Sequence, residues 1–157
     1  MNIVFDDLER TVNSPTGWGS FKIEIDGRNV TMLEDFEFIG AYVLTDIKDI
    51  MSAILELKKG EDDRVTVNLN GSVFEMEFAI LTGDLVKIST RIMEENGVKN
   101  SNEGEVELDE FCRELVRTVE EMERLRQPDQ DDLPARWEGI GQSVKNKKDE
   151  LRSLVGD

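Results

Sequence analysis

The segment 65–92 constrains the fold more than any other stretch of this chain, because its apolar side chains recur at every second position. A period of two is the pattern of a β-strand that buries one face. Asparagine and glycine at 70–71 predict a type I′ hairpin turn, since both central residues of that turn need a positive φ. This turn places Val67 opposite Phe74, so that the apolar side chains of both strands share one face.

The same segment contains a second predicted turn, at the threonine, glycine and aspartate of 82–84. A three-residue loop there pairs Ile80 with Val86 and Phe78 with Ile88. One apolar face then extends across all three strands, while the opposite face is polar. We therefore expect an antiparallel meander with one buried side and one side in water.

Residues 18–33 show the same alternation around an aspartate-glycine pair, which predicts another type I′ turn. With aspartate and glycine as the central residues, Ile23 faces Val30 and Phe21 faces Met32. Continued alternation would bury a glutamate just after this strand. We therefore expect a break or a bulge there.

Two amphipathic helices are predicted from apolar residues that recur three and four positions apart. The first spans 45–59, with Thr45 or Asp46 as its N-cap and Gly60 as a left-handed C-cap. The second spans 109–126, with its first residue, an aspartate, as the N-cap. Both helices are expected to pack their apolar faces against the sheet.

The single cysteine of the chain, Cys112, lies on the apolar face of the second helix. One cysteine cannot form an internal disulfide or a zinc cluster. Because the chain contains no histidine that could activate the thiol, we interpret Cys112 as a small buried apolar residue rather than a nucleophile. The opposite face of this helix, which includes Glu114, is charged and is expected to face water.

The remaining predicted elements are short. Residues 1–17 contribute a strand or a helical turn at one edge of the core, and further strands are expected near 36–43 and 105–108. The polar residues 93–104 are expected to form a loop. These elements predict an α+β fold, in which an antiparallel meander sheet of about six strands carries two helices on its apolar face.

The predicted domain covers 1–126, which is long enough to bury a hydrophobic core. Residues 127–157 begin as an acidic linker with prolines and continue, from about residue 137, as a weak C-terminal helix. We expect this segment to be flexible, loosely docked or ordered by a partner. The N-terminal residues are too acidic for a signal peptide and no stretch reads as a membrane span, so the expected location is the cytoplasm.

The formal net charge of −16, from 35 acidic and 19 basic residues, narrows the choice of partners. Such a charge repels nucleic acids and anionic membranes and favours a basic protein. The chain has no histidine, the commonest general base and zinc ligand, and no phosphate-binding loop, dinucleotide fingerprint or nucleophile elbow. We therefore expect no cofactor and no catalytic residues.

Acidic residues gather in four short clusters, which are either docking sites for a basic surface or solvated loop residues. The clusters are Asp6, Asp7 and Glu9; Glu34, Asp35 and Glu37; Glu61, Asp62 and Asp63; and Asp129, Asp131 and Asp132. The two tryptophans, Trp18 and Trp137, stand beside glycines and are either interface anchors or caps of the core. The predicted partner-binding residues are Trp18, Glu34, Asp35, Glu37, Glu61, Asp62 and Asp63.

Carboxylates can also bind a metal or act in catalysis, but the spacing here argues against both roles. Residues 61–63 and 129–132 lack the alternating ligands, the glycine and the terminal glutamate of a calcium loop. Glu75 and Glu77 share the polar face of one strand. Cross-strand ion pairs with basic residues of the next strand explain them more simply than a catalytic pair.

Four segments carry a resemblance to a known class of proteins: WGSFKIEIDGRNV, VTVNLNGSVFEMEF, LTGDLVKIST and LDEFCRELVRTVEEM. With a helix after the first segment and an acidic composition, this arrangement over about residues 18–125 resembles the immunity proteins of bacterial toxin systems, including contact-dependent and other polymorphic toxins. The resemblance implies a cytoplasmic protein that binds a cognate toxin domain tightly and blocks its active site or substrate groove. Many such toxins are nucleases with basic clefts. The resemblance carries over no site residues.

We therefore expect a non-catalytic, acidic protein-binding module, and the leading hypothesis is an immunity protein that occludes a toxin domain. A small acidic secretion chaperone or adaptor is one alternative. An enzyme of unrecognised carboxylate mechanism is another. A neighbouring gene for a large secreted protein with a variable C-terminal domain favours the first hypothesis, and a neighbouring secretion apparatus favours the chaperone.

Overall fold

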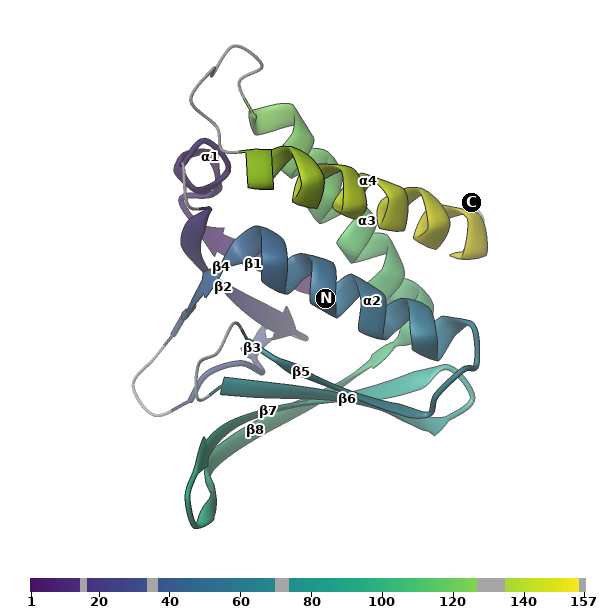
Figure 1. Cartoon of the computed structure of the whole chain (residues 1–157). Helices are drawn as coiled ribbons and strands as arrows, with labels where there is room; N and C mark the ends of the chain where they lie inside the picture. Colours follow the sequence, from purple (N-terminus) through teal and green to yellow (C-terminus); the bar gives the residue numbers. More distant parts are fainter. Residues whose placement is uncertain (15–16, 34–36, 70–73, 127–134, 156–157) are drawn as a thin grey trace.

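The computed structural model describes residues 1–14, 17–33, 37–69, 74–126 and 135–155. Over these residues the chain forms two antiparallel four-stranded sheets with helices packed on them (Figure 1). The predicted α+β class with antiparallel sheets is therefore confirmed. The strands form two sheets and not the single sheet predicted: the four strands before the first long helix make the first sheet, and the four strands after it make the second.

The first sheet is built around β2 (Trp18–Ile25), which pairs with the three other strands. These are β1 (Asn2–Asp6), β3 (Arg28–Asn29) and β4 (Ile39–Tyr42), all antiparallel to β2. Helix α1 (Leu8–Val12) connects β1 to β2. β3 pairs with the C-terminal end of β2 and β4 with its N-terminal half.

The turn between β2 and β3 has the predicted geometry. Asp26 and Gly27 are its central residues, with φ of 52° and 76°, as a type I′ turn requires. Val30 donates its N–H to the carbonyl of Ile23 at 2.9 Å. The predicted pairing of these two residues is therefore confirmed.

The strand that follows this turn breaks after Val30, earlier than predicted. The N–H of Ile23 donates to the hydroxyl of Thr31 at 3.0 Å. A side-chain oxygen therefore replaces the backbone carbonyl that would accept this N–H in a continued strand pair. Phe21 lies opposite Ile39 of β4, and Met32 is exposed. The predicted pairing of Phe21 with Met32 is therefore wrong.

The second sheet is a continuous antiparallel meander. Its strands are β5 (Arg64–Asn68), β6 (Phe74–Thr82), β7 (Leu85–Glu94) and β8 (Gly97–Glu107). Residues 93–104, predicted as a loop, instead form the end of β7, a tight turn and most of β8. Their polar side chains suit this place, because the β7–β8 hairpin extends past the end of β6 and its tip is exposed (Figure 1).

The β6–β7 hairpin keeps the predicted register. Ile80 lies opposite Val86 and Phe78 opposite Ile88. The turn is one residue shorter than predicted, and an irregularity at Leu81 compensates for the missing residue. The apolar face therefore continues across this turn.

The β5–β6 hairpin has a different register from the predicted one. Val67 lies opposite Met76 instead of Phe74, which is a shift of two residues. A shift of two keeps every side chain on its own face, so the apolar side of the sheet is as predicted. The predicted turn falls in 70–73, outside the described residues.

Three long helices cover the sheets: α2 (Val43–Lys58), α3 (Leu108–Leu125) and α4 (Ala135–Val155). α2 lies between the second sheet and α4, and α3 runs beside α4 (Figure 1). Val144 and Leu151 of α4 are buried. The C-terminal segment, predicted as a weak helix, is helical and packs on α2 and α3.

The predicted N-terminal caps of α2 and α3 are wrong, because both helices begin earlier than predicted. Tyr42 and Glu107 hold the N-cap positions, and neither side chain makes a capping hydrogen bond. Thr45 and Asp46 lie inside α2, where Asp46 is buried, and Asp109 forms an ion pair with α2 instead. The glycine that follows α2 has a φ of +72°, as its predicted C-cap role requires.

The apolar stripe of α3 is as predicted, with one addition. The predicted buried residues are Phe111, Cys112, Leu115, Val119 and Met122, and all are buried. Burial raises the pKa of the Cys112 thiol to about 11, which keeps it protonated at neutral pH. Glu114, expected in water, is also buried, because its carboxylate accepts the N–H of Ile3 at 2.8 Å and pairs with Arg117 at 2.5 Å.

The two sheets meet where β8 passes the end of the β2–β3 hairpin. A Cβ atom at Gly104 would lie 2.4 Å from Cγ1 of Val30, so the approach requires glycine. Arg28 reaches across, donating to Oδ1 of Asn102 at 3.1 Å and to the carbonyl of Glu103 at 2.5 Å. This junction fixes the first sheet relative to the second.

Candidate functional site

The structure separates the predicted partner-binding residues. Trp18 begins β2 and Glu37 precedes β4, so both belong to the first sheet. Residues 61–63 are exposed after α2, and this 16-residue helix, about 24 Å long, separates them from β4. Glu34 and Asp35 lie outside the described residues.

The first sheet has one face that points away from the core, which we call the outer face. Along β2, buried side chains alternate with exposed or half-buried ones, and the strand register places residues of β1 and β4 beside the latter. The outer face comprises Asn2, Val4 and Asp6 of β1, Trp18, Ser20, Lys22 and Glu24 of β2, and Gly40 and Tyr42 of β4.

Trp18 is the most exposed aromatic residue of this face. Its side chain is 52% exposed, and its ring packs edge-on against the ring of Tyr42 at a centroid distance of 5.1 Å. The indole also lies over Gly40, where a Cβ atom would stand 3.3 Å from Cζ2 of Trp18. Trp18 is therefore held in place by its neighbours while half of it meets solvent, which suits an interface anchor better than a cap of the core.

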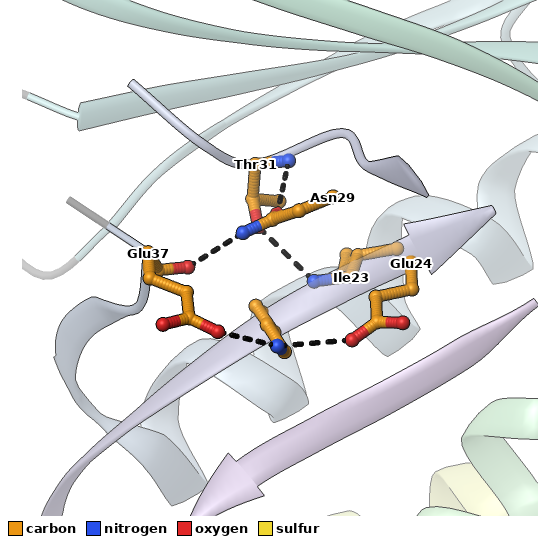
Figure 2. A network of polar contacts seen from close by, with 6 residues as sticks. Ile23, Glu24, Asn29, Thr31 and Glu37 are labelled. Carbon is orange, nitrogen blue, oxygen red and sulfur yellow. Dashed lines mark hydrogen bonds and ion pairs between the residues drawn. The ribbon is translucent and has the colours of Figure 1, made fainter. Parts of the chain in front are cut away.

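Lys22 is bound on this face between the carboxylates of Glu24 and Glu37, which are labelled in Figure 2. Its Nζ lies 2.8 Å from Oε1 of Glu37 and 3.0 Å from Oε1 of Glu24. The same Nζ stands 4.9 Å from the ring centroid of Phe38. Hydrogen bonds to Glu37 and then to Glu24 raise the pKa of the Lys22 ammonium. The predicted site residue Glu37 thus takes part in holding a cation against an aromatic ring.

A second set of hydrogen bonds fixes the backbone around Glu37 (Figure 2). Asn29 donates through Nδ2 to the carbonyl of Glu37 at 2.7 Å. Its Oδ1 accepts the N–H of Thr31 at 2.9 Å and the Thr31 hydroxyl at 2.7 Å. Sequence reasoning missed Asn29, although an asparagine that binds its own chain two residues on, just after a hairpin turn, is a recognisable Asx motif.

Negative charge dominates the outer face. Asp6 and Glu24 of this face, together with Glu37 beside it, supply three carboxylates against the one ammonium of Lys22. Glu24 and Glu37 already bind Lys22, whereas the exposed Asp6 can still form a hydrogen-bonded ion pair with a guanidinium or ammonium group of another molecule. Asp6 and Tyr42 were not among the predicted site residues, because only the pairing of β1 and β4 with β2 brings them beside Trp18.

The polar face of the second sheet has a different character. Arg91 contacts Glu75 at 2.7 Å and Glu77 at 3.2 Å, which confirms the predicted cross-strand ion pairs. All three side chains are partly buried, and Nη2 of Arg91 donates to both carboxylates, whereas its buried Nε has no hydrogen-bond partner among the described residues. Within the described ranges no group of three or more histidine, cysteine, aspartate or glutamate residues is placed to hold a metal ion.

No family model, no curated protein and no solved structure matches this chain. In the part of the chain that the structure describes, no helix is both long and apolar enough to cross a membrane.

Proposed function

We propose that this chain is a non-catalytic, acidic binding protein for a basic partner protein, and that it serves as an immunity protein for a toxin domain. The observation that carries the proposal is the outer face, which presents the half-exposed Trp18 at the start of β2 and the carboxylates of Asp6 and Glu24 further along the same face, with Glu37 beside Lys22. A net charge of −16 extends the same preference for cations to the whole molecule.

The mechanism proposed is occlusion. Trp18 and Tyr42 supply a rigid aromatic contact of the type that forms the centre of tight interfaces. Carboxylates elsewhere on the molecule meet lysine and arginine residues of the partner, and a nuclease active site that must attract nucleic acid is a suitable basic surface. The exposed acids at 61–63 add to the long-range field that steers the partner.

The proposal requires a neighbouring gene that encodes a large secreted protein with a variable C-terminal domain, so the test begins by sequencing the adjacent genes. That C-terminal domain is co-expressed with this chain, purified as a complex and titrated by calorimetry, and its toxicity is measured in cells with and without this chain. Tight one-to-one binding together with protection of the cells supports the function. Absence of binding at micromolar concentrations overturns it.

Binding by another surface is distinguished with a variant pair. Trp18→Ala removes the exposed aromatic group of the outer face, whereas Leu154→Ala removes an exposed apolar side chain of α4. Loss of affinity in the first variant alone supports the outer face as the docking surface. If both variants bind the partner as tightly as the wild-type chain, the partner binds elsewhere.

A further inference from the structure

β5 forms one edge of the second sheet, because among the described strands it pairs only with β6 (Figure 1). Ile80 of β6 donates its N–H to the carbonyl of Asp63, the residue before β5, at 2.8 Å. In an antiparallel pair, every second residue bonds to the neighbouring strand and the residues between them turn their N–H and C=O groups the other way. The backbone groups that point away from the sheet are therefore those of Arg64, Thr66 and Asn68.

These outward backbone groups have no hydrogen-bond partner among the described residues. The three residues that carry them are exposed, although α2 packs on β5. β5 thus presents a row of unpaired donors and acceptors, which is the template on which another strand can pair.

The chain covers two other strand edges with side chains. At the edge of β1, Glu114 accepts the N–H of Ile3 at 2.8 Å and Arg117 donates to the carbonyl of Ile3 at 3.5 Å. At the edge of β8, Arg28 donates to the carbonyl of Glu103 at 2.5 Å. Proteins commonly protect strand edges in this way against pairing with other chains. No side chain of the described residues protects β5, so its edge is available for pairing.

The sequence of β5 is suited to antiparallel pairing with a second copy of itself. In a pair centred on Thr66, the two Thr66 residues exchange both backbone hydrogen bonds, and Arg64 of each copy lies opposite Asn68 of the other. Val65 then lies opposite Val67 on the side of the sheet that faces the core. Every outward backbone group has a partner in this register, and threonine and β-branched pairs stabilise neighbouring strands.

The distribution of charge also favours a second copy at this edge. β5 is the one strand of the second sheet without an acidic residue, and its Arg64 pairs with Glu77 of β6. In the register centred on Thr66, the acids at 61–63 of the two copies lie about 20 Å or more apart, because each residue adds about 3.4 Å along a strand. That separation exceeds the Debye length of about 10 Å in 0.1 M salt. Repulsion between the acidic copies is therefore screened at this contact.

We propose that β5 pairs antiparallel with β5 of a second copy of this chain, centred on Thr66, and joins the second sheets of both copies into one. The strands are only five residues long, so they bury less than the roughly 800 Å² per partner of a standard interface. The dimer is therefore expected to exchange with the monomer. It uses no residue of the outer face, so it does not depend on the proposed function.

The first test is sedimentation equilibrium of the full chain over a range of concentrations and salt. Because each copy carries a charge of −16, the dimer fraction is expected to rise with salt as well as with concentration. Binding of a basic partner has the opposite salt dependence. A chain that remains monomeric at about 1 mM in about 500 mM salt overturns the proposal.

A proline substitution tests which edge is used. Thr66→Pro removes an N–H that points away from β6, so the bonds between β5 and β6 remain, whereas pairing at the free edge is blocked. Thr66→Val is the matched control, because it keeps the N–H and the β-branched shape. We expect Thr66→Pro to weaken the dimer at least about tenfold and Thr66→Val to change it about twofold or less. Equal dimerisation of the two variants overturns the proposal.

Cysteine cross-linking tests the register without depending on the proline variant. In the proposed pair the two Thr66→Cys thiols lie directly opposite, at the Cα separation of about 5.5 Å that suits a disulfide, whereas two Asn68→Cys thiols lie about 14 Å apart. The native Cys112 is buried and does not interfere. Oxidation with diamide is expected to link Thr66→Cys several-fold more than Asn68→Cys on a non-reducing gel. Equal linking of both variants, or of neither, overturns the proposal.

The open edge could instead be used by the basic partner, and the same variants distinguish this outcome. If the wild-type chain stays monomeric while Thr66→Pro weakens its binding to the toxin domain, a strand of the partner occupies β5 and the dimer is wrong. If the dimer forms but no toxin domain binds, the dimer stands and the immunity function is wrong.

Discussion

Asp46 is buried in α2 with 0% exposure, and neither of its carboxylate oxygens has a hydrogen-bond partner. Burial, with a smaller contribution from the charge of Asp49, raises the pKa of its carboxyl from an ordinary value of 3.8 to about 7. A buried carboxyl group without a partner destabilises the folded state much more when it is ionised than when it is protonated. Asp46 therefore links folding stability to pH.

The raised pKa of Asp46 makes the folded state less stable as pH rises. Because the pKa is higher in the folded state, the unfolded chain loses this proton first as pH rises from about 4, and the folded state is progressively destabilised up to about pH 7. Asp46→Asn is expected to stabilise the protein at pH 8, by at most about 4 kcal/mol, and to change little at pH 4. Urea unfolding at both pH values measures this. An equal gain at both pH values would contradict the assignment.

Gly104 provides a steric prediction at the junction of the sheets. Gly104→Ala places a methyl group 2.4 Å from Cγ1 of Val30, so the sheets must move apart locally. The expected loss of unfolding free energy is about 1–3 kcal/mol, measured by urea unfolding. Val30→Ala in the same background should recover part of the loss, because it removes the clashing atoms. A loss that this second substitution leaves unchanged would show that the clash is not its cause.

At the scale of single residues, the sequence predicts apolar burial well and buried charge poorly. Every predicted core position of α3 is buried, because spacing alone determines which side chains share a helical face. The sequence predicts that Glu114 faces water and that Asp46 caps a helix, because charged residues are mostly exposed. Their burial depends on contacts with distant segments, such as the N–H of Ile3, and helical spacing contains no information on these.

Secondary-structure elements show how far strand pairing follows from local pattern. The β2–β3 and β6–β7 pairings follow from turn chemistry, and both agree with the structure near their turns. The predicted β5–β6 register is wrong by two residues, yet the predicted buried face is right. The alternation of apolar residues determines which side chains share a face, but it does not determine the length of the connecting loop. The pairing of β8 with β7 over residues 93–104 was missed because most of these residues are polar and exposed, so no alternating buried face marks a strand there.

The residues of the outer face could be predicted from the sequence only in part. Trp18 and Glu37 could be selected from the sequence, since one is an isolated tryptophan beside glycines and the other belongs to an acidic cluster. Asp6 and Tyr42 reach the same face only through strand pairs that join residues 14 to 24 positions apart, Asp6 with Ser20 and Trp18 with Tyr42. Pairing over such distances depends on the whole sheet and not on any local motif.

The docking of α4 is testable through two leucines of the same helix. Leu151 has 0% exposure and Leu154 has 38%. If α4 unfolds together with the rest of the chain, Leu151→Ala should lower the unfolding free energy by about 2–4 kcal/mol, because it leaves a cavity between packed helices. Leu154→Ala serves as the control and should cost about 0.5 kcal/mol or less. Two separate unfolding transitions, with only the weaker one affected, would show that α4 is not part of the cooperative unit.

At the scale of the whole molecule, charge and shape have separate consequences for binding. The charge of −16 acts over distances of about a Debye length, roughly 10 Å in 0.1 M salt, and therefore affects how fast a basic partner arrives. Contacts at the outer face act only after docking and therefore affect how long the complex lasts. Among the predicted partner-binding residues, we therefore expect the acids at 61–63 to affect association and Trp18 to affect dissociation.

Kinetic measurements on the complex with the basic partner can separate the two roles. Neutralising the exposed acids with Glu61→Gln, Asp62→Asn and Asp63→Asn together should lower the association rate constant several-fold in low salt and leave the dissociation rate constant unchanged, because these residues lie beyond α2 from the outer face. The difference in association should disappear as salt rises from about 50 to about 500 mM. Trp18→Leu should do the reverse, raising the dissociation rate constant at every salt concentration, since it removes an anchor and no charge. Surface plasmon resonance at several ionic strengths measures both constants, and faster dissociation of the triple variant would place residues 61–63 in the interface itself.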